Sequence, residues 1–279
     1  MVIFQGEVNS NEKCINMGTS NGTLCIALCI RNESCLLALM TNEDCFHCNY
    51  GKVSSVTRSG DSSKYIALKM DYRFPSLLKE TDWWLLDIPQ YFTRDGSCPS
   101  GTFHLKTCKD GWEMFRRDSI WYCLKVVYNQ NPMNQSAAKL KCSNEQYGAK
   151  LSGLENMNET RFVAENVERE MISTDSASKR WDIWIDGERR PLCTSSSNVN
   201  KISDCKGING FEFSDNTLKK HGGYDWSEGE PNGRGDIQNC VVMMITTEVN
   251  TKNGKKNGKL DDIQCDALKR GVLCGMEAQ

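Results

Sequence analysis

The chain has 279 residues and a formal net charge of −2, which gives no reason to expect nucleic acid as a partner. It contains no apolar run long enough to span a bilayer. Its 15 cysteines are too many for an ordinary reduced cytosolic protein, so the composition indicates an extracellular setting. The length suffices for two modest domains.

The first residues, 1–7, are interrupted by glycine and charge, so they do not form a secretory signal peptide. Either the sequence begins downstream of a removed signal, or the chain stays inside the cell. We favour the removed signal, because the cysteines otherwise lack a purpose. N-glycosylation sequons at Asn21, Asn32, Asn134 and Asn158 add minor support for secretion.

Residues 1–70 are expected to form a small cysteine-rich domain. Residues 2–4 favour an edge strand, residues 23–30 a short helix and residues 65–69 a closing strand. An even number of cysteines indicates three bridges, whose pairing the sequence leaves open. The six are Cys14, Cys25, Cys29, Cys35, Cys45 and Cys48.

One alternative for this segment is a metal site at Cys45-Phe46-His47-Cys48. It is disfavoured because no second Cys/His pair follows at zinc-finger spacing. The segment instead resembles the small PAN-like (CW) domain that nematode secreted proteins place before a C-type lectin domain. The residues that carry this resemblance are Cys25-x-x-x-Cys29, Cys35-Leu36-Leu37-Ala38 and residues 65–69.

Residues 71–97 connect the two parts of the chain. Trp83-Trp84-Leu85-Leu86 is too apolar for a free linker. It could form a patch for a partner or a membrane surface, but packing against a domain is the favoured interpretation.

Residues 98–276 are expected to form a second domain. A helix is expected at residues 136–148, with Ala137, Leu140 and Tyr147 among its inward-facing candidates, together with Cys142. A second helix is expected at residues 158–171, with Asn158 as its N-cap and an apolar face of Phe162, Val163, Val167 and Met171. Alternating apolar residues predict a strand at residues 181–185, and a run of apolar residues predicts another at 241–245.

Several short motifs follow one another in order along this part. They are Trp184-Ile185-Asp186-Gly187, Tyr224-Asp225-Trp226, Glu230-Pro231-Asn232, Cys240-Val241-Val242-Met243 and Leu260-Asp261-Asp262, bracketed by Cys142 and Cys274. As an ordered set they resemble the C-type lectin domain, over roughly residues 108–274. The resemblance implies an α+β, C-type lectin-like fold with two helices, antiparallel sheets and disulfide-bonded loops. It also implies a calcium site and a sugar ligand.

The resemblance implies how eight of the cysteines pair into disulfides. The expected bridges are Cys108–Cys123, Cys142–Cys274, Cys193–Cys205 and Cys240–Cys265. Cys98 is then left over. It could link two chains into a dimer that gains avidity, or it could replace Cys108 in the pairing, and both remain open.

The candidate site lies between residues 230 and 265, where hard oxygen donors suit calcium and not zinc. By the family pattern five residues would hold both metal and sugar, namely Glu230, Asn232, Gln238, Asp261 and Asp262. Gln238 stands where the family normally has Glu, and Asp261 where it has Asn. The two departures offset each other in charge, so three carboxylates remain. Alternatively, Asp261 and Asp262 only shape a turn.

The two departures bear on which sugar is bound. At one sugar hydroxyl the family uses Glu as acceptor and Asn as donor, whereas here Gln238 would donate and Asp261 accept. Glu230-Pro231-Asn232 alone therefore does not establish mannose preference, and glycans of mannose or galactose type are expected partners.

Three function classes remain: a calcium-dependent lectin, a lectin-like domain that binds protein or lipid without sugar, and a glycosidase using Glu230 and Asp262. The sequence favours the lectin, with innate immunity as a possible role. The enzyme is disfavoured, because acids crowded enough to bind calcium are poor acid/base pairs while the ion is present.

Overall fold

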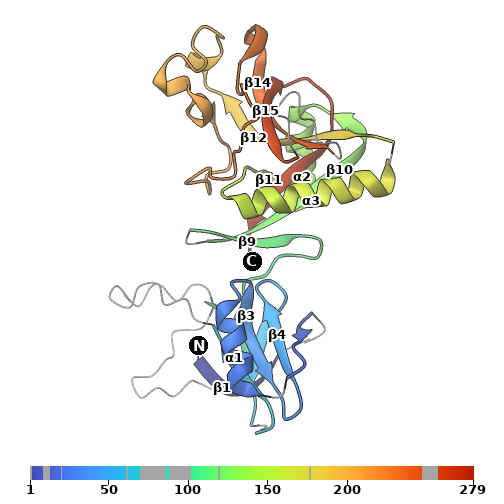
Figure 1. Cartoon of the computed structure of the whole chain (residues 1–279), viewed down its shortest axis with the longest axis vertical. Coiled ribbons are helices and arrows are strands. Elements are labelled where there is room, and N and C mark those ends of the chain that lie inside the picture. The colour runs from blue at the N-terminus through green and yellow to red at the C-terminus, as the bar shows by residue number, and fades with distance from the viewer. Residues whose placement is uncertain are drawn as a thin grey trace. The chain divides into compact units, whose positions relative to one another are not determined.

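The computed structural model describes residues 2–8, 13–19, 21–60, 62–69, 86–87, 102–118, 120–175, 177–246 and 257–279. The chain divides into two compact units, Met1–Asp110 with Ala278–Gln279, and Gly111–Glu277 (Figure 1). Trp83, Trp84, Leu85 and Cys98 lie outside the described residues, so the apolar patch and the intermolecular bond expected there stay predictions, as do the domain borders at residues 70 and 98. Among the described residues, no helix is long and apolar enough to cross a membrane.

The N-terminal unit is built on one antiparallel sheet of eight described strands, ordered β2-β4-β3-β6-β1-β5-β8-β7, with one helix, α1 (Gly22–Arg31). The strands are β1 (Val2–Val8), β2 (Ile15–Asn16), β3 (Cys35–Met40), β4 (Cys45–Asn49), β5 (Ser55–Arg58), β6 (Tyr65–Leu68), β7 (Leu86–Asp87) and β8 (Thr102–Leu105). The predicted helix and closing strand are confirmed as α1 and β6. The strand predicted at residues 2–4 is confirmed as the start of β1, where the described register pairs it with β6 alone; β5 pairs with the later residues 6–8.

Three disulfides hold this unit together, and they supply the pairing that the sequence left open. They are Cys14–Cys48, Cys25–Cys45 and Cys29–Cys35. Helix α1 begins after Asn21, whose side chain accepts a hydrogen bond from the Leu24 N–H at 3.0 Å. Two buried cysteines four residues apart, Cys25 and Cys29, tie the helix to β4 and β3.

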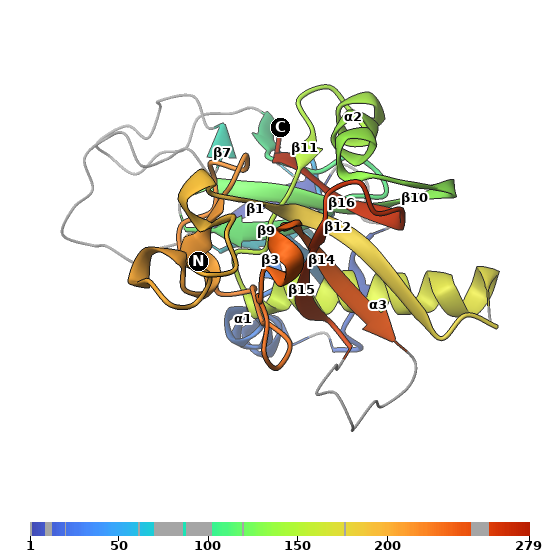
Figure 2. The ribbon, with the colours of Figure 1, turned by 90° about the horizontal axis from the view of Figure 1, so that it is seen from above.

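The C-terminal unit has a sheet ordered β15-β14-β12-β16-β10-β9, to which the short strands β11 and β13 are added. Helices α2 (Gln135–Glu145) and α3 (Met157–Thr174) lie on either side of these strands in Figure 2. The strands are β9 (Glu113–Arg117), β10 (Ile120–Met133), β11 (Lys150–Leu151), β12 (Arg180–Arg189), β13 (Phe211–Glu212), β14 (Gln238–Thr246), β15 (Lys259–Gln264) and β16 (Lys269–Glu277). Four 3₁₀ turns lie between β12 and β14, at Pro191–Cys193, Ser203–Cys205, Gly207–Gly210 and Arg234–Asp236.

Helix α2 ends at Glu145, three residues before its predicted end, and of its predicted inward-facing candidates only Cys142 is buried. Its buried residues are Gln135, Ala138 and Cys142, whereas Leu140 is 64% and Tyr147 is 90% exposed. The exposed Ala137 is also outside the buried face. The Cys142–Cys274 bond explains the difference, because it fixes the face that carries Cys142 against β16.

The N-cap of helix α3 lies two residues before the predicted one. Asn156 is the N-cap, and its side chain accepts hydrogen bonds from the Asn158 and Glu159 N–H groups at 3.0 and 3.2 Å. The predicted apolar face is confirmed, since Val163 and Val167 are buried in the core between α3 and the sheet. Asn158 is thus a helical residue and not the cap.

A fully buried arginine, Arg117 at the end of β9, lies at the centre of a polar network inside this unit. Its Nε and Nη2 donate to the two carboxylate oxygens of Glu159, at 2.9 and 2.7 Å. Its Nη1 donates to Asp215 and Thr217, both at 2.8 Å. The guanidinium also lies 4.0 Å from the ring centroid of Tyr122. Every donor nitrogen of this arginine is therefore bonded.

The predicted bridges Cys142–Cys274, Cys193–Cys205 and Cys240–Cys265 are confirmed. Cys108 and Cys123 are each disulfide-bonded, and their mutual pairing stays a prediction.

Candidate functional site

Strands β14 and β15 form an antiparallel hairpin that carries the acidic end of the candidate site. In its register Asp262 lies opposite Val241, and Asp261 lies opposite Val242. The Cys240–Cys265 bond joins the two strands, with Cα atoms 5.1 Å apart. The positions of both aspartates therefore follow from the pairing of a buried apolar strand.

A turn at residues 230–233 forms the other end of the site. The Glu230–Pro231 peptide bond is cis. Gly233 has a φ of 60°, and a Cβ atom there would lie 2.6 Å from Val199, so the turn requires glycine at this position. Asn200 donates a hydrogen bond to the Pro231 carbonyl at 2.6 Å. The loop closed by the Cys193–Cys205 bond therefore supports the turn.

The fold brings three of the five candidate residues into one carboxylate cluster. One carboxylate oxygen from each of Glu230, Asp261 and Asp262 lies within 4.8 Å of the other two. Glu230 and Asp261 are half-buried, whereas Asp262 is fully buried. Three like charges at this separation repel one another, so the cluster requires a nearby positive charge.

Asp262 has such a charge within the chain, because it forms a buried ion pair with Arg189 of β12. The Arg189 Nη2 lies 2.5 Å from Asp262 Oδ2, and both side chains are 0% exposed. Asp262 also accepts hydrogen bonds from the backbone N–H groups of Asn232, at 2.9 Å, and Gly233, at 2.8 Å. One carboxylate therefore joins β12, β15 and the 230–233 turn.

The two amide residues of the candidate set meet at a single backbone donor. The Arg234 N–H donates to Oδ1 of Asn232 at 2.8 Å and to Oε1 of Gln238 at 2.9 Å. The two amide oxygens are thus turned toward the backbone of the loop. All five candidate residues lie at this place in the fold, although their atoms are not all directed at one point.

Arg189 is the residue that sequence reasoning missed. The apolar alternation of residues 181, 183 and 185 extends to position 189, which is a signal for an inward-facing side chain. The register of β12 against β14 shifts between Ile185 and Glu188. Such an irregularity can reverse which side chains face inward, so the sequence alternation alone does not predict the direction of Arg189. Its guanidinium lies 4.6 Å from the ring centroid of Phe211, which in turn stacks on Trp226.

The residues present fit a calcium ion in donor type and in charge. Calcium takes oxygen ligands, carboxylates above all, and the cluster offers three of them. Three carboxylates and one guanidinium leave two negative charges, which one divalent cation balances. The residues that would hold the ion are Glu230, Asp261 and Asp262, with Asp262 shared with Arg189.

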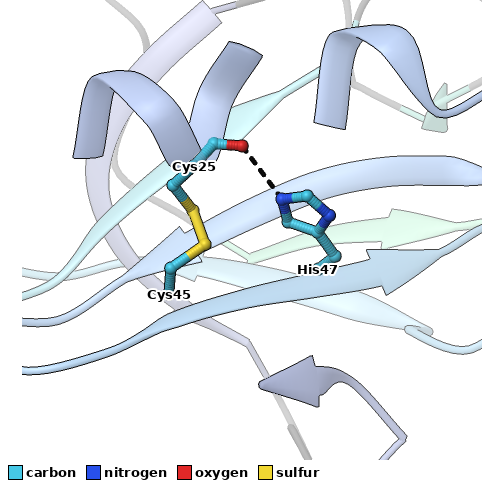
Figure 3. A group of neighbouring side chains, drawn as sticks. All are labelled: Cys25, Cys45 and His47. Atoms are coloured by element: carbon cyan, nitrogen blue, oxygen red, sulfur yellow. Dashed lines mark hydrogen bonds between the residues drawn. A yellow bond between two sulfur atoms is a disulfide. The ribbon is translucent and has the colours of Figure 1, made fainter. Parts of the chain in front are cut away.

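A second group of possible metal ligands, Cys25, Cys45 and His47 of the N-terminal unit, is closed to metal (Figure 3). The two sulfur atoms are bonded to each other, at 2.02 Å. The His47 Nε2 lies 2.9 Å from the Cys25 carbonyl oxygen, with which it forms a hydrogen bond. Cys48 is bonded to Cys14. The metal alternative for residues 45–48 is therefore wrong for this oxidised domain.

The fold of the C-terminal unit and its hairpin site define a C-type lectin-like domain. A family model described as C-type lectin domain-containing protein 141/158 matches residues 116–276, more than half of the chain. The chain therefore belongs to this family, which is one of carbohydrate-binding lectins. A PAN-like domain model matches residues 1–70.

Similar solved structures include the cow carbohydrate-recognition domain of CD23, solved in the presence of a GlcNAc2Man3 oligosaccharide. It is 20% identical, with a TM-score of 0.40, over 62% of this chain and 98% of that one. A calcium-independent type II antifreeze protein is 17% identical, with a TM-score of 0.40, over 63% and 98%. The C-type lectin CEL-I from Cucumaria echinata is 14% identical, with a TM-score of 0.39, over 60% and 96%. A search of curated proteins finds no match.

Proposed function

We propose that the C-terminal domain is a calcium-dependent glycan-binding module whose site consists of Glu230, Asn232, Gln238, Asp261 and Asp262. The observation that supports this most directly is the convergence of three carboxylates within 4.8 Å of one another. In this proposal the protein is extracellular, as its disulfides favour. N-glycosylation at the four sequons and a role in innate immunity belong to the same proposal.

The bound ion would supply the positive charge on which two neighbouring sugar hydroxyl oxygens are held. The chain's own residues fix the orientation of those hydroxyls. Each hydroxyl can donate a hydrogen bond to a carboxylate and accept one from an amide N–H. Asn232 and Gln238 use their oxygens on the Arg234 N–H, which leaves their –NH₂ groups as the donors available to a ligand. Glu230 and Asp261 are the acceptors in this arrangement.

This assignment bears on sugar choice. At the second hydroxyl Gln238 is the donor and Asp261 the acceptor, the reverse of the family pattern. A hydroxyl that meets the wrong partner leaves a buried polar group unpaired, which costs about 1–3 kcal/mol. We therefore infer that specificity is set by this pair together with Glu230 and Asn232, and that the ligand is of mannose or galactose type.

The test is binding of the whole protein to immobilised mannose, N-acetylglucosamine and galactose, with calcium and with chelator. Asp261→Asn keeps the side-chain shape but removes the acceptor charge, so it should weaken glycan binding at least about tenfold. Asp266→Asn is the matched control, because Asp266 is exposed just after β15 and loses the same charge.

Three results would contradict the proposal. Binding that survives chelator would remove calcium dependence, and equal binding by Asp261→Asn and wild type would remove the assigned site. Failure to bind any glycan would favour the alternative of a lectin-like domain that binds protein or lipid. Asp262→Ala is a poorer probe, because Asp262 also holds the 230–233 turn.

A further inference from the structure

We propose that Arg189 is a resident cation of this site. It holds Asp262 and the 230–233 turn in their binding arrangement when calcium is absent, and calcium, when bound, shares Asp262 with it. The calcium half of this inference rests on the proposed function. The calcium-free half stands on contacts within the chain alone.

The first step is the isolation of Asp262 from water. Its side chain is fully buried, and a buried carboxylate is strongly unfavourable unless it is paired and hydrogen-bonded. Arg189 supplies the opposite charge at 2.5 Å, and the Asn232 and Gly233 N–H groups supply two further hydrogen bonds. Asp262 therefore has its counter-charge without any metal.

The second step is the support of Arg189 itself. Its Nε donates to the Gln238 carbonyl at 3.0 Å, which ties the guanidinium to the start of β14. Its guanidinium carbon lies over the Phe211 ring, 4.6 Å from the centroid, and Phe211 stacks on Trp226 with the ring centroids 5.4 Å apart. The guanidinium is thus anchored on the sheet and remains in place whether or not an ion binds.

The third step is the effect on calcium. A positive charge beside Asp262 reduces the attraction of the cluster for a second cation, so Arg189 lowers calcium affinity. It also separates loop assembly from calcium binding, because the turn is already held by Asp262. In a site where calcium is the sole cation, removing the ion would leave the carboxylates to repel one another and the loop would open.

Arg189→Gln tests both halves. In chelator the variant should melt roughly 5–15 °C below wild type, because Asp262 is left buried without a counter-charge. Saturating calcium should restore much of this loss, while it raises the melting temperature of wild type less. Calcium titration should show at least about tenfold tighter binding by the variant. Arg161→Gln, on the exposed face of α3, removes the same charge elsewhere and should leave all three quantities unchanged.

Arg189→Lys separates charge from packing, and it also guards against a variant that fails to fold. It keeps the positive charge but loses the planar guanidinium, so it should recover part of the melting temperature lost in chelator by Arg189→Gln. If Arg189→Lys is as unstable as Arg189→Gln, the charge is not what Asp262 requires, and the inference is overturned.

Two further outcomes overturn the proposal. A loss for Arg189→Gln that is equal in chelator and in calcium would mean that Arg189 only fills space. No loss in chelator would mean that Asp262 does not depend on it. The proposed function fails by a different readout: if no glycan binds while the melting shifts appear as expected, the lectin activity is wrong and the resident cation stands.

Discussion

The C-terminal unit contains two buried arginines with unlike surroundings. Arg117 faces two acids, Glu159 and Asp215, and each of its three nitrogens donates to at least one acceptor. Arg189 faces Asp262 through Nη2 and a carbonyl through Nε, while its buried Nη1 has no hydrogen-bond partner among the described residues. One guanidinium is fully bonded within the fold, and the other is not.

The difference between the two arginines indicates which of the two acidic clusters can bind calcium as a second cation. The two buried acids around Arg117 are balanced by Arg117 together with Lys150, whose Nζ lies 3.9 Å from Asp215 Oδ1. The acids around Arg189 outnumber it, and two of them, Glu230 and Asp261, are half-buried at a loop. We therefore expect stability to depend on Arg117 under all conditions, but on Arg189 mainly when calcium is absent.

The largest expected effect is that of Arg117→Met. The substitution leaves Glu159 buried without its ion-pair partner and Asp215 with only Lys150, at 3.9 Å, which should cost about 3–5 kcal/mol of unfolding free energy. Because no calcium donor is involved, the loss should be the same in chelator and in calcium, as measured by chemical denaturation. Arg116→Met is the neighbouring control on the same strand, and it should cost far less because Arg116 is partly exposed. A loss for Arg117→Met that calcium reverses would break the comparison.

A smaller effect is expected at Asp182, whose ion pairs are partly exposed. Burial by itself raises the pKa of Asp182, but Arg180 and Lys269 outweigh it and hold the pKa below its ordinary value. A lowered folded-state pKa stabilises the fold above the unfolded pKa of about 3.9, and this contribution is lost as pH falls through the folded value. Asp182→Asn should thus cost roughly 1 kcal/mol near neutral pH.

The cost of Asp182→Asn should disappear in acid, because the protonated carboxyl group of the wild type is then uncharged, as the amide of the variant is. The measurement is unfolding free energy against pH for both proteins, in chelator. A difference that stays constant down to low pH would show that the charge of Asp182 is not responsible. The ion pairs of Asp182 with Arg180 and Lys269 are therefore expected to contribute less stability than those of Arg117 or Arg189.

Much of the fold could be predicted from the sequence, because short motifs and cysteines constrain it strongly. The helices and core strands appear where apolar periodicity placed them, and three predicted disulfides of the lectin-like domain form. On α2 the prediction placed Cys142 inward correctly, whereas Leu140 on the helix and Tyr147 just beyond its end are apolar yet exposed. Apolar residues at a surface are common, so periodicity alone could not separate them from the buried Ala138.

The sequence predicted which acidic residues form the candidate site, but it did not predict the ion pair between Arg189 and Asp262. Glu230, Asp261 and Asp262 were expected to converge, and their carboxylates lie close together. Arg189 lies 73 residues from Asp262, across a register shift in β12, and no local pattern links the two. Long-range pairing of a buried acid with one of many arginines is set by the assembled sheet, which sequence spacing does not reveal.

The most direct test of the central claim is a double-mutant cycle on Arg189 and Asp262, followed by thermal unfolding in chelator and in calcium. The proteins are wild type, Arg189→Gln, Asp262→Asn and the double variant. In chelator the double variant should melt above Arg189→Gln, because residue 262 is then no longer a fully buried charge without a partner, and calcium should raise its melting temperature less than that of Arg189→Gln. If the effects of the two substitutions simply add in both conditions, Arg189 and Asp262 do not act as a pair, and the account of this site is contradicted.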